Sequence, residues 1–152
     1  MMLERYIDIS LIRPELSATS QEEVIREMAR FIAASRKEIS AEEVEAALSA
    51  REQLDSTGIQ EGIAIPHAKM ESVKTPFIAL GRSTAGINFH SHDDTPTHLF
   101  FVMLAPTSGV DEHIKLLSRI AKLLERTSLK ERLLSAKGAK EIYDALMEFD
   151  RA

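Results

Sequence analysis

The chain has 152 residues, no cysteine and a formal net charge of −5, and its 19 basic residues are scattered along the sequence. A nucleic-acid surface normally appears as a basic patch, so no nucleic-acid partner is expected. The lack of cysteine excludes disulfides and thiol chemistry and is compatible with a cytoplasmic protein. No apolar run approaches the roughly 20 residues of a membrane helix, and the acidic start is unlike a signal peptide. Direct membrane insertion is therefore not expected.

The N-terminal part is predicted to form a strand followed by two helices. Alternating apolar residues from Ile7 onward predict a short first strand that ends at Pro14. The Ser-x-x-Glu capping pattern occurs at 20–23 and again at 40–43. Apolar residues recur at helical intervals after each cap, which predicts one helix over about 21–35 and a second that ends before Gly58.

Residues 56–69 combine a glycine turn with a short strand. The two glycines of the turn allow backbone angles that other residues rarely adopt. The apolar residues that follow alternate with period two and place His67 on the same face. Because Pro66 has no amide hydrogen for a sheet ladder, this strand should lie at an edge or end there. The sequence thus predicts a histidine at the mouth of a short strand, beside a turn.

Two further strands are predicted in the middle of the chain. Residues 76–82 predict a buried strand, and residues 83–96 form a polar excursion. The nearly continuous apolar run 99–104 lies between Pro96 and Pro106. Such a run is typical of a central strand that is buried on both faces.

Helical periodicity returns in the last third of the chain. Apolar residues spaced three and four apart place His113 on the core-facing side of a helix that extends to about Leu124. It lies in the first turns, where free amides and the helix dipole favour an anion. The capping pattern occurs a third time at 128–131 and predicts a short helix that extends to about Ala136. A last helix is predicted over about 140–149. With 44% hydrophobic residues, we expect one α/β domain over 1–152, with a mixed β-sheet flanked by α-helices on both faces.

Three residues are candidates for chemistry, and each has an alternative structural explanation. His67 is either a hydrogen-bonded histidine at a strand end or a nucleophile, since an imidazole that titrates near pH ~6.5 can attack phosphorus. His113 is either a packed helix histidine or a donor to negative charge. Arg51 is either a solvated helix residue or a forked clamp for phosphate oxygens. The patterns alone leave these alternatives open.

A rival constellation lies in the segment His90-Ser-His92-Asp93-Asp94. Zinc binds imidazole and carboxylate groups, so the corresponding function is a metal-dependent hydrolase built on His90, His92 and Asp93. However, the segment is predicted as a polar loop, and the HExxH spacing of zinc enzymes is missing. A histidine-rich surface loop is favoured, and no metal is expected. The glycine motifs of nucleotide sites are also missing, so no cofactor is expected.

Residues 51–68 (Arg-Glu-Gln-Leu-Asp-Ser-Thr-Gly-Ile-Gln-Glu-Gly-Ile-Ala-Ile-Pro-His-Ala) resemble the active-site block of enzyme IIA of the mannitol/fructose class. These enzymes belong to the phosphoenolpyruvate-dependent phosphotransferase system. The resemblance continues through Gly81-Arg-Ser, Leu104-Ala-Pro and Glu112-His-Ile-Lys-Leu-Leu, and so covers nearly the whole chain. It implies a single enzyme IIA-like domain over 1–152, with a mixed sheet covered by helices.

The same resemblance implies a function. The histidine of the Ile-Pro-His segment, here His67, would accept a phosphoryl group from an HPr-like phosphocarrier protein. It would then pass the group to an enzyme IIB or use it as a regulatory switch on a target protein. Arg51 and His113 match the family's arginine and second active-site histidine, which stabilise charge without a metal. The expected protein is a cytoplasmic phosphoryl carrier in sugar transport or nitrogen regulation, and the Ser-Thr-Gly-Ile run favours the latter.

The sequence departs from the family pattern at two places. Gln60-Glu61 stands where many relatives have Gly-Asn, and it brings a carboxylate near the incoming phosphoryl group; the mannitol branch has a Glu at the same spacing before its active histidine. The second departure is the loop over 90–94, to which no role is assigned. Glu61 argues for the alternative function, a regulatory protein-binding module on the same fold that is never phosphorylated.

Overall fold

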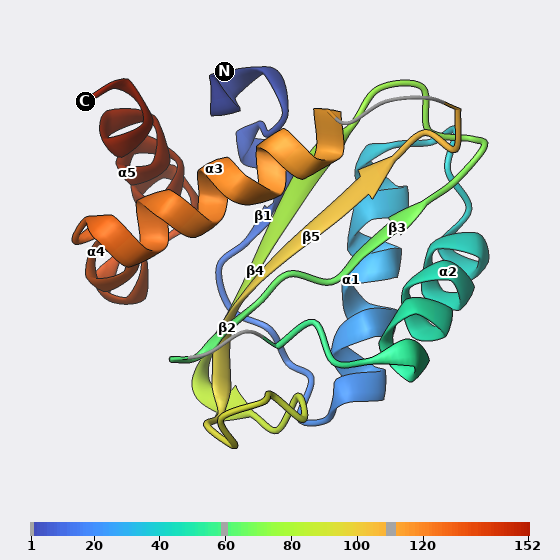
Figure 1. Ribbon diagram of the computed structural model, residues 1–152, viewed down its shortest axis with the longest axis horizontal. Helices are drawn as coiled ribbons and strands as arrows, with labels where there is room; N and C mark the ends of the chain where they lie inside the picture. Colours follow the sequence, from blue (N-terminus) through green and yellow to red (C-terminus); the bar gives the residue numbers. More distant parts are fainter. Residues whose placement is uncertain (1, 59–60, 109–111) are drawn as a thin grey trace.

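The computed structural model describes residues 2–58, 61–108 and 112–152 (Figure 1). Two short 3-10 helices, η1 (Leu3–Arg5) and η2 (Ile9–Leu11), precede the other elements. The strands are β1 (Ile12–Arg13), β2 (Ile63–Ala64), β3 (His67–Lys69), β4 (Phe77–Ile87) and β5 (Thr97–Ala105). The α-helices are α1 (Gln21–Ser35), α2 (Ala41–Leu54), α3 (Glu112–Arg126), α4 (Leu129–Ser135) and α5 (Ala139–Arg151). All the predicted helices are present.

The starts of α1 and α2 follow the predicted capping chemistry, whereas the start of α4 does not. At α1 and α2, the hydroxyls of Ser20 and Ser40 each accept the amide of the residue three positions further on, at 3.2 and 3.3 Å. Such bonds satisfy amides that have no partner within the helix. At α4, Ser128 makes no capping bond, and the amide of Leu129 donates to the Thr127 hydroxyl instead, at 3.1 Å. The capping prediction is therefore wrong at α4.

The strands form one mixed sheet in the order β1-β4-β5-β2, and β3 also pairs with β5. The two long strands, β4 and β5, are antiparallel, whereas β1 runs parallel to β4. Both β2 and β3 run parallel to β5, with Ile63 opposite Leu99 and His67 opposite Met103. β5 thus lies at the centre of the sheet, as its apolar sequence predicted.

Helices cover both faces of this sheet, which confirms the expected architecture. Figure 1 shows α1 and α2 on one face and α3 crossing the other, with α4 and α5 beyond it. The core follows from this layering, because every residue of β5 except His98 is buried. None of the helices within the described parts of the chain is long and apolar enough to cross a lipid bilayer.

Two predicted strand boundaries are wrong. The strand expected from Ile7 to Pro14 is shorter than predicted. The Asp8 carboxylate accepts the Ser10 amide at 3.0 Å and starts η2, so β1 covers only Ile12–Arg13. In the segment expected to be irregular from residue 83, β4 continues to Ile87. It does so across an irregularity in its pairing with β5. A bulge of this kind lets polar residues remain in a strand.

Candidate functional site

His67 begins β3 at the edge of the sheet and is half-buried. Pro66 lies between β2 and β3, and β5 is the strand with which both of them pair, so the expected edge position is confirmed. The ring Nδ1 of His67 lies 2.8 Å from the backbone oxygen of Ile65. A carbonyl oxygen can only accept, so Nδ1 carries the hydrogen and donates it. Nε2 of His67 therefore keeps its lone pair.

The surroundings of His67 favour its neutral form. Burial is the main cause that lowers the pKa of His67, and the hydrogen bond to Ile65 opposes this effect. The positive charges of Arg51 and His113 lower the pKa further. An imidazole that stays neutral keeps the lone pair that a nucleophile needs.

Arg51 comes from the last turn of α2. Its Nη1 donates to the backbone oxygen of Asp55 at 2.7 Å, just beyond the end of that helix. A cation is favourable there because the last carbonyls of a helix carry partial negative charge. This contact uses one guanidinium nitrogen, and the fork has further donors for an anion.

One hollow of about 620 Å³ brings together the three residues that the sequence singled out. Arg51 lines it from the end of α2, His67 from β3, and the half-buried His113 from the first turn of α3. The other lining residues are Ala47, Ala50, Leu54, Ala68, Lys69, Met103 and Ala105. The arrangement offers a nucleophilic ring beside a cation and a second imidazole.

A second hollow adjoins the first, since Arg51 and His67 also line it. Its remaining wall comes from the turn after α2, from Ile65, from His92 and from the part of α3 between Ile114 and Ala121. Large apolar side chains stand out at the rim of this region: Leu54 is 82% exposed and Ile114 54% exposed. Exposed apolar groups around a polar centre are typical of a surface that contacts another protein.

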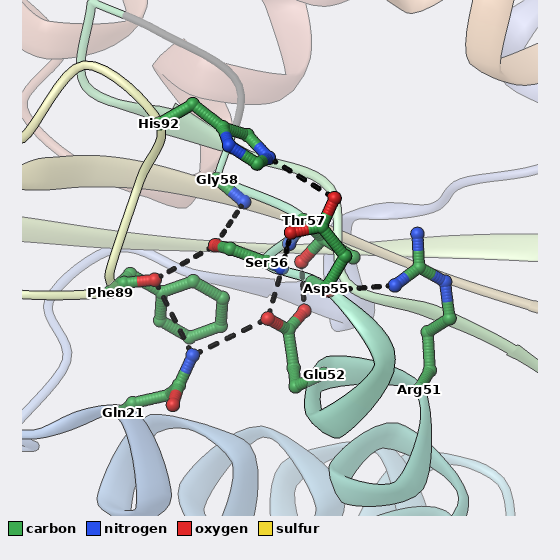
Figure 2. A network of polar contacts seen from close by, with 9 residues as sticks. All are labelled: Gln21, Arg51, Glu52, Asp55, Ser56, Thr57, Gly58, Phe89 and His92. Carbon is green, nitrogen blue, oxygen red and sulfur yellow. Dashed lines mark hydrogen bonds and ion pairs between the residues drawn. The ribbon is translucent and has the colours of Figure 1, made fainter.

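The turn between α2 and β2 is held by side chains from several elements, as Figure 2 shows. The Glu52 carboxylate accepts the Thr57 amide at 3.1 Å and also the Thr57 hydroxyl. The Ser56 hydroxyl donates to the backbone oxygen of Phe89 at 3.0 Å, and the Gly58 amide donates to that hydroxyl. The turn is thus fixed both to α2 and to the β4–β5 connection.

Sequence reasoning missed Glu52. Its neighbour Arg51 drew attention as a phosphate clamp, and a glutamate on a helix is usually solvated. A usable signal was present, because a negative charge in the last turn of a helix opposes the helix dipole. A carboxylate in that place calls for a specific donor, and Thr57 supplies two.

The histidine-rich loop forms a different arrangement from the metal site considered above. The Asp93 carboxylate accepts the Thr95 hydroxyl at 2.7 Å and the Glu61 amide at 2.9 Å, and these bonds hold the pKa of Asp93 far below its usual value. Nε2 of His92 lies 3.4 Å from the Asp55 carboxylate. Across the described residues, no group of three or more His, Asp or Glu side chains is placed to hold a metal ion.

Comparison with known proteins identifies the class of protein to which this chain belongs. The family model for "Phosphoenolpyruvate-dependent sugar phosphotransferase system, EIIA 2" matches residues 5–149. The chain is 35% identical over 129 residues to a nitrogen regulatory protein of Pseudomonas aeruginosa, covering 85% of this chain and 84% of that protein. It is 37% identical over 140 residues to the fructose-specific EIIABC component of Bacillus subtilis, covering 92% of this chain but only 22% of that protein.

Solved structures agree. The crystal structure of nitrogen regulatory protein IIA-Ntr from Neisseria meningitidis superposes with a TM-score of 0.85 at 29% identity, covering 93% of this chain and 97% of that one. The IIA component in a complex with phosphorylated mannitol IIB from Escherichia coli shares the fold, with a TM-score of 0.77 at 23% identity over 93% of this chain and 97% of its own. The chain belongs to the EIIA 2 family of the phosphoenolpyruvate-dependent sugar phosphotransferase system. It is thus a phosphotransferase component, as the sequence predicted.

Proposed function

We propose that His67 is the residue of this chain that accepts the phosphoryl group. The observation that carries the proposal is the hydrogen bond from Nδ1 of His67 to the backbone oxygen of Ile65, at 2.8 Å. This bond leaves Nε2 as the only ring nitrogen with a free lone pair. The half-buried ring borders two hollows, from which a donor can approach it.

In the proposed reaction the donor is a phosphohistidine on an HPr-like phosphocarrier protein. The phosphorus–nitrogen bond of the donor breaks, and its electron pair returns to the donor nitrogen, while phosphorus bonds to Nε2 of His67. The proton on Nδ1 stays in place, so positive charge develops on the ring. The Ile65 carbonyl, which accepts that proton's hydrogen bond, stabilises this charge.

Arg51 and His113 would stabilise the phosphoryl oxygens during this transfer. Phosphoryl transfer proceeds through a loose in-line transition state, so catalysis consists mainly of positioning and of charge stabilisation. Both side chains line the hollow that His67 borders. The charges of both side chains also lower the pKa of His67.

The onward partner would be an enzyme IIB or a regulated target protein. The exposed Leu54 and Ile114 beside the site support docking of another protein there. The similarity to both fructose-specific and nitrogen-regulatory relatives leaves both routes as proposals. We expect the exchange to take place in the cytoplasm, with which the acidic, cysteine-free chain agrees.

The alternative, a binding module that is never phosphorylated, rested on Glu61. Among the described residues, neither hollow at His67 counts Glu61 in its lining. Glu61 is exposed, and its amide donates to Asp93 in the neighbouring loop. Gln60, the other half of this departure, lies outside the described residues. The position of Glu61 therefore favours the phosphorylated form of the function.

The test is incubation with phosphoenolpyruvate, enzyme I and HPr, followed by intact-mass measurement. We expect a gain of about 80 Da, one phosphoryl group in place of a hydrogen, that is lost in His67→Ala. His90→Asn is the matched control, because His90 is exposed at φ 56° and asparagine tolerates that backbone. No gain with any HPr-like donor would favour the binding module.

The same assay, followed over time, tests whether Arg51 stabilises the phosphoryl oxygens. Arg51→Ala should slow phosphoryl acceptance about 100-fold, as expected when one donor to a developing charge is removed. Arg30→Ala removes an exposed arginine of α1 and should leave the rate unchanged. Equal rates for the two variants would make Arg51 an ordinary solvated helix residue.

A further inference from the structure

Glu52 is a half-buried carboxylate that the proposed transfer does not use. Its oxygens accept three hydrogen bonds, from the Thr57 amide at 3.1 Å, from the Thr57 hydroxyl, and from Nε2 of Gln21 at 3.3 Å. Burial raises the pKa of Glu52, while the bonds from Thr57 and the charge of Arg51 oppose the rise. An ionisable group is costly to bury, so its partners should matter.

A continuous path of hydrogen bonds leads from Glu52 to the ring of His67. Glu52 holds Thr57 by both its amide and its hydroxyl. The Thr57 carbonyl in turn accepts the amide of Ile65 at 3.0 Å. The carbonyl of the same Ile65 accepts Nδ1 of His67 at 2.8 Å. Each link fixes the orientation of the next peptide group, so a shift at Thr57 is passed to the ring.

The start of this path is anchored to the body of the protein. Nε2 of Gln21, the first residue of α1, contacts both the Glu52 carboxylate and the backbone oxygen of Phe89, at 3.3 and 3.4 Å. Figure 2 shows Gln21 and Glu52 meeting below the turn. Thr57 is itself 6% exposed, so solvent has little access to its side of the contact. The path therefore begins where α1, α2 and the β4–β5 connection meet.

We propose that Glu52 and Thr57 form a positioning unit that sets the tautomer and orientation of His67 through Ile65. The proposal rests on the proposed function, because it assigns these residues to the reaction at His67. Glu52 and Thr57 need not touch the phosphoryl group. They hold the Ile65 peptide so that its oxygen accepts a hydrogen bond from Nδ1 of His67, which keeps Nε2 unprotonated.

The alternative is that Glu52 and Thr57 only stabilise the end of α2. Both explanations predict a lower melting temperature when the contact is lost, so stability does not separate them. The tautomer does, because the Nε2–H form predominates in a free histidine. A ring released from Ile65 should shift toward that form, and Nε2 would then lose its lone pair.

The experiment compares Thr57→Val with Thr57→Ser. Valine has nearly the shape of threonine but cannot donate to Glu52, whereas serine keeps the hydroxyl. Nitrogen-15 NMR of the imidazole gives the tautomer of His67 without any phosphoryl donor, and a timed assay with phosphorylated HPr gives the rate of acceptance. Glu52→Gln is compared with Glu45→Gln, a glutamate of α2 that pairs with Arg26 instead.

We expect the Nδ1–H tautomer in the unaltered protein, in Thr57→Ser and in Glu45→Gln. Thr57→Val and Glu52→Gln should contain a substantial Nε2–H fraction and accept the phosphoryl group about 10- to 100-fold more slowly, the scale of a small misplacement of a reacting group. An unchanged tautomer in folded Thr57→Val would overturn the positioning role, whatever its rate. Failure of the unaltered protein to accept phosphoryl would instead count against the proposed function, while the tautomer comparison still decides the role of Thr57.

Discussion

At the scale of single residues, the proposed chemistry depends on one hydrogen bond between the backbone and the imidazole ring of His67. Ile65 lies in the gap between β2 and β3, where its carbonyl bonds to the ring of His67. Pro66 makes this gap, because it has no amide hydrogen for the ladder. Because the proline interrupts the strand, the carbonyl oxygen of Ile65 is available to accept the hydrogen on Nδ1 of His67, and Nε2 keeps its lone pair.

The lowered pKa of His67 predicts a pH dependence of its reactivity. Burial first, and the charges of Arg51 and His113 after it, favour the neutral ring, against the opposing bond to Ile65. An NMR titration should therefore give a midpoint for His67 below the ordinary 6.5. The rate of phosphoryl acceptance should fall as pH decreases through that midpoint, because a protonated ring has no lone pair.

The same shift contributes to the pH dependence of folding stability. Between the lowered pKa of folded His67 and 6.5, the unfolded chain binds more protons, so stability rises with pH through this window. The contribution is complete above 6.5 and is lost as pH falls toward the folded pKa. His67→Ala should flatten this part of the curve in denaturant titrations. An identical slope in the variant would show that His67 does not carry the shift.

At the scale of elements, the turn after α2 depends on close packing against the β4–β5 connection. A methyl group added at Gly58 would lie 2.8 Å from Cβ and 2.9 Å from Cα of Ser91. Contacts that short force the backbone to move, because Cα of Ser91 cannot rotate away as a side chain can. Gly58 is therefore required for the two segments to meet beside His67.

Gly58→Ala should lower the free energy of unfolding by about 1–3 kcal/mol, the usual range for overpacking. It should also broaden or shift the NMR signals of His67, since Gly58 forms a bridge with Ala64 next to Ile65. Gly138→Ala is the matched control, because nothing lies within 4 Å of its added methyl group and its φ is 175°. Similar stability changes for the two substitutions would contradict the close packing at Ser91.

At the scale of the whole molecule, the site exists because three distant segments converge. Arg51 comes from α2 on one face of the sheet, His67 from its edge, and His113 from α3 on the other face (Figure 1). The position of α3 therefore matters for the site. The buried carboxylate of Asp150 in α5 holds α3 in place. It accepts hydrogen bonds from Nε of Arg119 in α3 at 2.9 Å and from the Leu3 amide at 2.7 Å.

Asp150→Ala should lower the free energy of unfolding by about 3 kcal/mol, since it leaves the Arg119 charge and the Leu3 amide without their buried acceptor. Glu148→Ala removes an exposed pair with Arg132 and should cost less than about 1 kcal/mol. Urea denaturation of both variants measures the difference. A cost at Asp150 no larger than at Glu148 would mean that the junction of α5, α3 and the N-terminus contributes little.

Much of the fold follows from patterns that are local in sequence. Capping residues and helical spacing predict the helices, and the apolar run of β5 predicts its central place in the sheet. The strand expected from Ile7 to Pro14 is reduced to β1, because the Asp8 side chain bonds to the backbone and stabilises a turn that the apolar alternation does not indicate. The predicted end of β4 came too early, because the polar residues after Arg82 indicated a loop where the strand continues through an irregularity to Ile87.

The family, the order of the helices and the block that contains His67 are readable from the sequence, because each is carried by short patterns of neighbouring residues. The tertiary structure decided that Arg51, His67 and His113 share one hollow, and that Glu52 connects through Thr57 to the ring. It also decided the hydrogen-bond partners of the loop over 90–94. These features depend on distances between segments that are remote in sequence, and such distances are fixed only when the sheet and its two helical layers pack together.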